Sequence, residues 1–567
     1  MNFKQNIIDE IKNITKAESI KIEIPPDSKL GDFAVPCFQF SKLLKKDPNK
    51  IAENLKFELK DNIKGISDIK VAGPYINFFV NKIILAEIIL KQINKEKQKY
   101  GKTNDSKLKV LIESPAPNTN KPLHLGHVRN MLLGNALVDL NKAIGNKTYR
   151  VDVVNDRGIH ICKSMLAYHK FGENKEPDKK SDHFVGDFYV LYSKKLQHHP
   201  EMEQEIKEML RKWEQNDKQV KDLWKKMNDW ALKGFKQTYE TYGVEFDKVY
   251  YESDHYVGGR DIILKALDKG VFEKDEDNNI IIDLEKQKLG KKVVLRSDNT
   301  SIYITQDIAL ADLRYKDYKM DKMVYVVGSE QIYHFKVLFE ILKRLEYKFA
   351  PNCYHLAYGM VELPEGKMKS REGTVVDADD LADDMKNLSK QEIIKRHQNL
   401  DEQEINKRSE QISMGAIKFF MLKYDPMKDF TYDPKKSLDF EGETGPYVQY
   451  AHARICSILR KAQKQNIKLE LKINFGLLSH ETEHKLITLL SNFENIIISS
   501  AEHHKPSTLC RYLLDIAQTF NEFYHKCVVL DKDKPEITKS RLLLSDCVRQ
   551  VLENGLGLLG IEAPSSM

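Results

Sequence analysis

"LKVLIESPAPNTNKPLHLGHVRNMLLGNALVDLNKAIG", residues 108–145, begins with an apolar run typical of a buried strand and passes through a Pro- and Asn-rich loop into helical spacing. The helical pattern ends at a glycine, and His124, Gly126 and His127 fall at the turn from strand to helix. Backbone N–H groups and the helix dipole favour an anion at such a turn, where imidazoles can donate to phosphate oxygens. Taken alone, an HxGH pattern fits surface or core histidines, or half of a metal site, equally well.

Three more apolar runs alternate with helical stretches: "TYRVDVVN" (148–155), "KMVYVVGS" (322–329) and "CYHLAYGMV" (353–361). This alternation predicts a doubly wound, Rossmann-like parallel sheet. In such sheets ligands bind at the carboxyl ends of the strands, which is where the two histidines are expected. Residues 172–250 are charged, have helical spacing and hold all three tryptophans, so we interpret them as an insertion in the sheet.

The rest of the chain divides around this multidomain α/β core. Helical patterns and the β-like run "IKVAGPYINFFVN" (69–81) predict an α+β amino-terminal domain, and after about residue 385 only helical spacing remains, which predicts an all-α bundle. The predicted ranges are 1–105 for the amino-terminal domain, 106–385 for the sheet domain, 386–440 for a connecting helical segment and 441–567 for the helical domain.

The composition describes a chain without an obvious membrane segment. Apolar residues make up 41% and charged residues 31% of 567, and the mean hydropathy is −0.51. No window reaches the ~20 apolar residues of a membrane helix, and the start of the sequence lacks the apolar stretch of a signal peptide, so we expect a cytoplasmic protein. The net charge of +6, from 90 basic and 84 acidic residues, is weak support for a polyanionic partner. The seven cysteines form no CxxC pair, and we expect no metal site.

A second motif makes the first more specific. "GKMKSREGT" (366–374) places three cations between two glycines just after a predicted strand, and such a loop can close over a triphosphate, although alone it would be read as a solvated turn. With HLGH after an early strand and KMKS after a late one, the chain resembles a class I aminoacyl-tRNA synthetase. The stretches "SPAPNTNKPLHLGHVRN" (114–130), "LRSDNTSIYITQDIA" (295–309), "GSEQIYHFKVLFE" (328–340) and "TGPYVQYAHAR" (444–454) are similar to bacterial-type arginyl-tRNA synthetases.

The amino acid pocket is inferred from chemistry and from this resemblance together. We expect Glu113, Tyr303 and Asp307 at strand ends near the cleft, where two carboxylates and a phenol suit a planar guanidinium. Each acid taken singly would be an ordinary surface or capping residue. The resemblance implies that L-arginine is bordered by Glu113, Ser114, Pro115, Asn118, His124, Tyr303, Asp307 and Gln331, with Glu252 as a further candidate.

The resemblance also implies an ATP site, with Mg²⁺ accompanying the nucleotide. ATP would contact His124, Gly126, His127, Lys367, Met368 and Ser370, and the catalytic groups would be His124, His127, Lys121, Lys367 and Lys369. The second signature of the class normally reads KMSK, whereas here Ser370 stands in the place of the final lysine. We hypothesise that Lys121 supplies the missing charge, with Lys369 or Arg371 as competing suppliers and a merely solvated Lys121 as the alternative.

The implied partner is tRNA(Arg), bound even for the first step of the reaction by a monomeric enzyme. Its expected contacts are Asn77, Tyr447, Tyr450 and Met567. The two tyrosines lie three apart on one helical face and could stack on bases, but they could equally be helix core, and the strand with Asn77 could be a plain edge strand. Three other functions compete with this one: another class I synthetase such as the cysteinyl type, an inactive paralogue that only binds RNA, and a smaller HxGH nucleotidyltransferase.

Overall fold

The computed structural model describes residues 3–25, 27–59, 63–256, 258–298, 302–362, 364, 376–397, 399–469 and 471–567. The signature Lys367, Met368, Lys369 and Ser370 therefore lies outside the described residues. The chain divides into two compact units, which are considered separately here. One comprises Met1–Tyr100, Ile455–Phe493 and Gln518–Val551, and the other comprises Gly101–Arg454, Glu494–Ala517 and Leu552–Met567.

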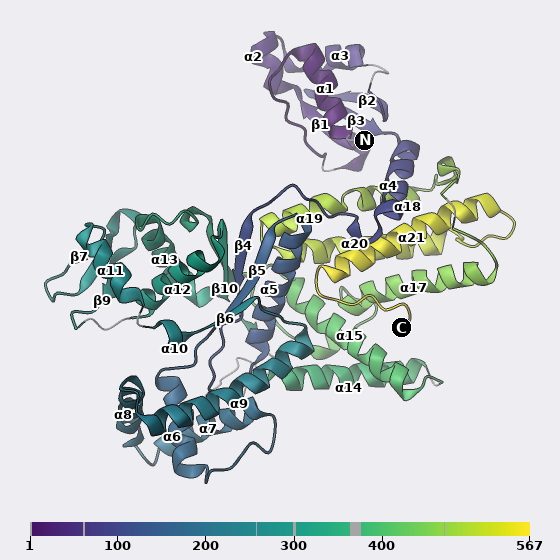
Figure 1. Ribbon diagram of the computed structural model, residues 1–567. Helices are drawn as coiled ribbons and strands as arrows, with labels where there is room; N and C mark the ends of the chain where they lie inside the picture. Colours follow the sequence, from purple (N-terminus) through teal and green to yellow (C-terminus); the bar gives the residue numbers. More distant parts are fainter. Residues whose placement is uncertain are drawn as a thin grey trace. The chain divides into compact units, whose positions relative to one another are not determined.

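The larger unit is built on a five-stranded sheet with the order β11-β10-β4-β5-β6, in which every neighbouring pair is parallel (Figure 1). Its strands are β4 (Lys109–Glu113), β5 (Lys147–Val154), β6 (Lys248–Tyr251), β10 (Lys322–Gly328) and β11 (Cys353–Tyr358). The predicted parallel, doubly wound sheet is confirmed. The chain leaves central β4 toward β5 on one side and returns on the other side through β10, so the order reverses beside the carboxyl end of β4, the usual place of a ligand site.

Helices cover both faces of the sheet. Helix α5 (Leu125–Ala143) contacts β4, β5 and β10 and is buried over most of its length. Its Gly134 lies so close to the loop after β4 that an added Cβ would come within 2.4 Å of the Ser114 Oγ, which explains a glycine in the middle of a helix. The other face carries a core formed by Leu111, Val151 and Tyr325 with the helices α11 (Gly259–Asp268), α12 (Tyr303–Tyr318) and α13 (Ile332–Arg344).

The segment between β5 and β6 is helical, as we expected for the insertion. It consists of α6 (Ile159–Phe171), α7 (Ser181–Leu196), α8 (Met202–Glu214) and α9 (Lys218–Tyr242). These helices share a hydrophobic core of their own. The sequence did not reveal strand β6 or a small antiparallel sheet, β7 (Glu273–Lys274), β8 (Ile280–Leu284) and β9 (Gly290–Leu295), which follows the short helix α10 (Glu252–His255).

Two local predictions in this region are wrong. Tyr303 and Asp307 lie one turn apart on helix α12, not at a strand end. The helix starts there because the Thr305 hydroxyl accepts a hydrogen bond from the Ile302 N–H at 3.0 Å, which caps the first turn. The run "CYHLAYGMV" does not form one strand either, since β11 ends at Tyr358 and β12 (Val361–Glu362) pairs separately with β13 (Phe430–Thr431).

The smaller unit begins with helices α1 (Phe3–Thr15), α2 (Ser41–Leu44), α3 (Pro48–Leu59) and α4 (Lys82–Glu96) and a three-stranded antiparallel sheet. The sheet order is β1 (Phe33–Pro36), β3 (Tyr75–Val80), β2 (Ile66–Ala72). Strand β3 is thus central, and the alternative that it is an edge strand is wrong. Its Asn77 pairs with Ala34 and Lys70, and its side chain is 4% exposed.

The carboxyl third is helical, as expected. Its helices are α14 (Ala378–Arg396), α15 (Glu402–Leu422), α16 (Pro434–Ser437), α17 (Gly445–Lys464), α18 (Glu481–Ser491), α19 (Phe493–Glu502), α20 (Pro506–Lys526) and α21 (Pro535–Gly557). The domain ranges given above stay predictions. Among the described residues, no helix is both long enough and apolar enough to span a bilayer.

A buried ion pair joins the carboxyl end of the central strand to helix α12. Glu113, the last residue of β4, bonds to the guanidinium of Arg314 on α12, and their side chains are 7% and 1% exposed. The guanidinium also lies 5.3 Å from the ring centre of Tyr250 on β6. Because both charges are out of water, each depends on the other for its stability.

We expect Arg314→Met to lower the stability of the larger unit by about 3 to 5 kcal/mol, since it leaves the Glu113 carboxylate buried without its cation. Adding Glu113→Gln removes that charge and should recover part of the loss. Calorimetric melting of the parent, the single variant and the double variant measures both effects. A single variant that melts with the parent, or a double variant less stable than the single one, would contradict this account.

Candidate active site

The two signature histidines form the first turn of α5. His124 is the N-cap residue, and its Nδ1 accepts the Gly126 N–H at 3.2 Å. The His127 Nδ1 in turn accepts the His124 N–H at 3.1 Å. Since both Nδ1 atoms are acceptors, the proton of each neutral ring sits on Nε2, which remains as a donor. Gly126 lies close to the ring, and an added Cβ would be 3.1 Å from the His124 Cε1, a tight contact that the ring would have to relieve by a small shift.

The charge state of this turn follows from its burial. Burial, together with the nearby Lys121 ammonium, lowers the pKa of His124 to about 3, and it lowers the pKa of His127 well below its usual value. Burial also lowers the pKa of Lys121. Two neutral Nε2–H donors, one lysine and the amino end of a long helix therefore converge, an arrangement that suits a phosphate.

The chain beyond the second signature returns to the same turn. Val376 O accepts the Leu125 N–H at 3.1 Å, and Leu123 O accepts the Ala378 N–H at 2.9 Å, so residues 376–378 pair with residues 123–125. The turn also borders a cavity of about 680 Å³ that is lined by Lys121, His124, Phe188 and Tyr189, among others. The structure therefore brings the start of α14 beside the first signature.

The predicted arginine residues occupy the carboxyl ends of three strands and the start of α12. Ser114 is fully buried: its hydroxyl donates to Asn130 O at 3.2 Å and accepts from Arg150 at 3.0 Å. Pro115 is also buried, whereas Asn118 is exposed. Glu252 follows β6 directly, and the exposed Gln331 follows β10.

Acidic groups cluster at this end of the sheet. Burial is the largest cause that raises the pKa values of Glu113 and Glu252, and the charge of Asp307 adds to both shifts, so the three carboxylates lie within electrostatic reach of one another. Burial is the main cause of the shift at Glu252, whose pKa rises to about 7, although Arg157 lies 3.7 Å away and opposes it. Tyr303, one turn before Asp307, is 77% exposed. Each of the three carboxylates also has a cationic or imidazole neighbour, which is Arg314, Arg157 or His334. A cluster of partly buried carboxylates at the mouth of a sheet is a candidate site for a cationic ligand.

Several residues that the sequence did not single out support this cluster. His334, three residues after Gln331, bonds to the Asp307 carboxylate at 2.6 Å, and this bond raises the pKa of His334. After β5, the Asp156 carboxylate accepts the Ser253 N–H and hydroxyl at 2.9 and 2.6 Å. On β5 itself, Asp152 accepts the Ala116 N–H at 2.9 Å. Ligands bind at the carboxyl ends of parallel strands, and this principle, applied to the predicted strand 148–155, would also have pointed to Asp152 and Asp156.

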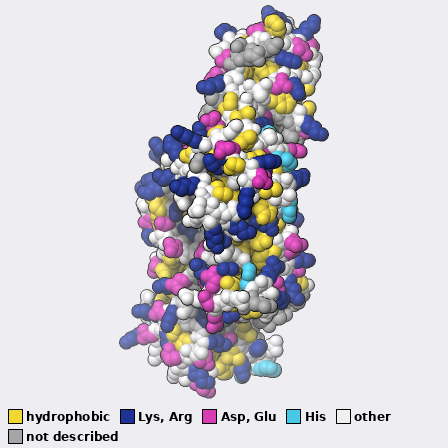
Figure 2. Space-filling view, turned by 90° about the vertical axis from the view of Figure 1, so that its right-hand side faces the viewer, with side chains coloured by type: hydrophobic (Ala, Val, Ile, Leu, Met, Phe, Trp, Pro, Cys, Tyr) yellow, Lys and Arg dark blue, Asp and Glu magenta, His cyan; other side chains and the backbone are white. Residues whose placement is uncertain are grey.

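The expected tRNA contacts differ in exposure. Tyr447 and Tyr450 are half-buried on α17, and the Arg454 guanidinium lies 4.7 Å from the ring centre of Tyr450. The main-chain oxygen of Met567 lies 3.1 Å from the His397 Nε2. Figure 2 looks from the side on which α17 and α21 are drawn in Figure 1, and Lys and Arg side chains gather in the middle of this view, with Asp and Glu among them. Such a group of cations suits a phosphate backbone.

Comparison with known proteins identifies the family of this chain. The family model "tRNA synthetases class I (R), catalytic domain" matches residues 89–434, "DALR anticodon binding domain" matches 448–567, and "Arginyl tRNA synthetase N terminal domain" matches 1–80. The arginine–tRNA ligase of Treponema denticola is 46% identical over 553 residues, covering 96% of this chain and 94% of the relative. That of Parabacteroides distasonis is 42% identical and covers 97% of this chain and 96% of the relative.

Solved structures give the same result. Thermus thermophilus arginyl-tRNA synthetase superposes with a TM-score of 0.84 at 25% identity, covering 99% of both chains. A methionyl-tRNA synthetase from Mycobacterium tuberculosis reaches a TM-score of only 0.51 at 11% identity, so the likeness to other class I synthetases is one of fold. With the matches spanning all three segments, the chain belongs to the arginyl-tRNA synthetase family of class I aminoacyl-tRNA synthetases.

Proposed function

We infer that this chain is an arginine–tRNA ligase, which activates L-arginine with ATP and transfers it to tRNA(Arg). The observation that carries this inference is the pairing of two sites at one end of the sheet: the phosphate-binding turn at His124 and His127, and the acidic cluster around Asp307. Family membership supports the same reaction. An enzyme that joins an amino acid with a cationic side chain to a triphosphate needs both sites together.

The reaction has two steps. An oxygen of the arginine carboxylate attacks the α-phosphate of ATP, which forms arginyl-adenylate and releases pyrophosphate. A hydroxyl of the terminal ribose of tRNA then attacks the carbonyl carbon, and AMP leaves. Both steps develop charge on phosphate oxygens, so the enzyme acts by positioning the reactants and by hydrogen bonding to that charge.

The residue roles are proposals that follow the geometry. ATP is held at the turn by the Nε2–H groups of His124 and His127 and by the close approach at Gly126, with Lys367, Met368, Lys369 and Ser370 contributing from the second signature. Lys121 adds a cation from the loop before α5. Mg²⁺ enters as part of the ATP complex, bound by the phosphates.

The arginine side is proposed in the same way. Asp307 and Glu252 face the guanidinium, Tyr303 and Gln331 border it, and the loop Glu113, Ser114, Pro115 and Asn118 with His124 borders the reacting end. Because Glu113 already bonds to Arg314 and Ser114 to Asn130, these two act chiefly by shaping the loop. Arginine is thus selected by charge and by bidentate geometry.

The tRNA would contact Tyr447, Tyr450 and Met567 on the helical segment and Asn77 in the amino-terminal domain. The matched anticodon-binding model, over residues 448–567, includes Tyr450 and Met567 and begins one residue after Tyr447, and the Lys and Arg side chains in Figure 2 also support these contacts. Asn77 has less support, since only 4% of it is exposed. A cytoplasmic monomer that requires bound tRNA for the first step completes the proposal.

ATP–pyrophosphate exchange tests the function directly. We expect exchange with arginine alone among the protein amino acids, and only when tRNA(Arg) is present. Exchange with cysteine or another amino acid would point to a different class I synthetase. Tight tRNA binding without exchange under any condition would identify an inactive RNA-binding paralogue.

Asp307→Asn should raise the KM for arginine at least tenfold, on the order of 2 kcal/mol, because it removes a charged partner of the guanidinium at a half-exposed position. The affinity for tRNA should stay at the parent value, since the proposed tRNA contacts do not include Asp307. Steady-state exchange and filter binding provide the two measurements. A folded variant with unchanged arginine dependence would exclude Asp307 from the pocket.

Arginine binding should release protons near pH 7. Glu252 has a pKa raised to about 7 in the free enzyme, so about half of it is protonated at that pH, and a guanidinium bound beside it would drive the proton off. Affinity for arginine should therefore rise as the pH goes from 6 to 8. Calorimetric titrations in buffers of different ionisation enthalpy count the protons. The variant Glu252→Gln should show less release, and equal release would assign the proton elsewhere.

Lys121→Ala should slow tRNA-stimulated exchange on the order of a hundredfold, because one cation facing the phosphates is lost. Adding Ser370→Lys should restore part of the rate if Lys121 compensates for the serine at that position. The matched variants Lys369→Ala and Arg371→Ala separate the competing suppliers. If Lys121→Ala keeps the parent rate while Lys369→Ala is impaired, the charge comes from Lys369.

A further inference from the structure

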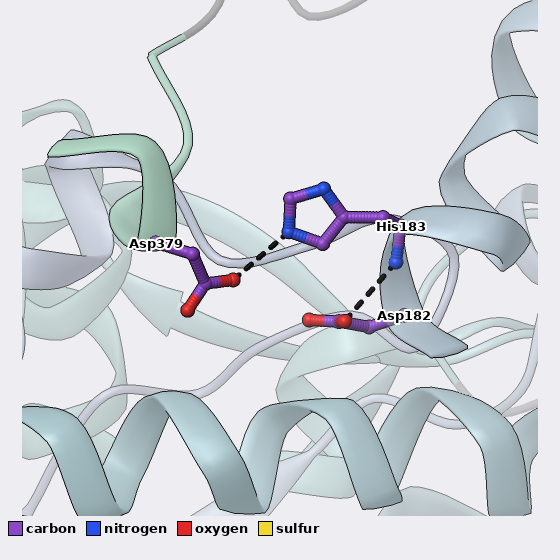
Figure 3. A group of neighbouring side chains, drawn as sticks. All are labelled: Asp182, His183 and Asp379. Carbon is purple, nitrogen blue, oxygen red and sulfur yellow. Dashed lines mark hydrogen bonds and ion pairs between the residues drawn. The ribbon is translucent and has the colours of Figure 1, made fainter. Parts of the chain in front are cut away.

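A network of charged side chains lies between the helical insertion and the first turn of α14 (Figure 3). The Lys180 Nζ is 2.9 Å from the Asp182 Oδ2 and 2.8 Å from the Asp379 Oδ2. The His183 Nε2 is 2.9 Å from the same Asp379 oxygen, and its Nδ1 is 3.5 Å from Asp377. On α9, the Thr238 hydroxyl donates to the other Asp379 oxygen at 3.0 Å. The Asp379 carboxylate on α14 thus bonds to side chains at the start of α7 and on α9.

The same atoms could be mistaken for a metal site. One ligand atom from each of Asp182, His183 and Asp379 lies within 4.8 Å of the others. However, the Lys180 ammonium already lies within hydrogen-bond distance of both carboxylates and takes the place that a cation would need. The hydrogen bond to Asp379 also raises the pKa of His183, which favours its protonated form. The place between the two carboxylates is therefore occupied by a cation of the protein itself.

The network acts on a segment that reaches the ATP-binding turn. Residues 376–378 pair with residues 123–125 through the two backbone hydrogen bonds described above. From the insertion, the Tyr242 hydroxyl donates to Ala378 O at 2.7 Å. The start of α14 is consequently held on one side by the insertion and bonded on the other side to the residues that flank His124.

Two glycines show how tightly the insertion fits this arrangement. A Cβ added to Gly186, on α7, would lie 2.6 Å from the Pro122 Cδ in the loop before His124. A Cβ added to Gly234, on α9, would lie 2.2 Å from the Asp182 Oδ1. Both positions are inside helices, where glycine is unfavourable, so close packing accounts for them. Helix α7 therefore contacts the ATP-binding loop directly at Pro122 and indirectly through Asp379.

We propose that Lys180, His183 and Asp379 are positioning residues for adenylate formation: they lock the insertion onto residues 376–379 and thereby fix the His124 turn at the phosphate site. This proposal rests on the proposed ATP-binding role of His124 and His127. It assigns the insertion a part in the first chemical step, with no contact to the substrates by the network itself.

The test is Lys180→Met in tRNA-stimulated ATP–pyrophosphate exchange. We expect kcat to fall on the order of a hundredfold and the KM for ATP to rise, as when reacting groups are misplaced by about 1 Å, while the KM for arginine stays at the parent value. Lys180→Arg, which keeps a cation between the carboxylates, should recover most of the rate. Lys179→Met is the matched control, since Lys179 pairs with Asp187 at the surface, where both side chains are exposed.

Several outcomes would overturn the proposal. One is that Lys180→Met has the same kinetics as the parent. Another is that Lys180→Met changes kcat and both KM values to the same extent and that Lys180→Arg does not restore them. If Lys180→Met does not fold, Thr238→Val decides: it should also raise the KM for ATP, and an unchanged KM would exclude the network.

His124→Asn separates this proposal from the function itself. Asparagine keeps a side-chain acceptor for the helix start but lacks the Nε2–H donor. Impaired exchange in His124→Asn together with normal exchange in Lys180→Met would remove only the positioning role. Parent exchange in His124→Asn would remove the phosphate role of the turn, and the positioning proposal with it.

Discussion

The first turn of a helix has backbone N–H groups that must find acceptors, and in α5 the acceptors are two imidazole nitrogens. This constraint determines much of the site. It fixes the ring orientation, places the remaining proton of each ring on Nε2 and leaves little room for a side chain at Gly126, between the two histidines. Residues 376–378 lie along the edge of the same turn, so the start of α14 is bonded through its backbone beside this pair of rings.

Burial favours the neutral form of the side chains in both halves of the site, so it lowers the pKa values of the histidines and raises that of Glu252. At the histidines it removes positive charge, because the pKa values of both rings fall, and the turn meets a phosphate as a neutral donor with a lysine nearby. At Glu252 it favours the protonated form. The histidines and Glu252 therefore carry less charge before the substrates bind than these side chains would carry in water. This limits the repulsion among like charges in the site.

The sheet could be predicted from the sequence because its strands are short apolar runs between helical patterns, and four of the five were found that way. Strand β6 was missed because "KVYY" is short and begins only a few residues after the charged helix α9. Tyr303 and Asp307 were expected at a strand end near the cleft, yet the Thr305 hydroxyl caps a helix there. The network around Asp379 could not be predicted, since His183 lies 196 residues before its partner and only the folded chain brings them together.

Gly186 and Gly234 also bear on protein engineering. Replacing helical glycines with alanine is a common route to greater thermal stability, worth about 0.4 to 1 kcal/mol where the space exists. Here it would push a methyl group into Pro122 or Asp182. A stabilisation campaign guided by helix propensity alone would therefore select two substitutions that damage the enzyme, and libraries built on this scaffold should keep glycine at both positions.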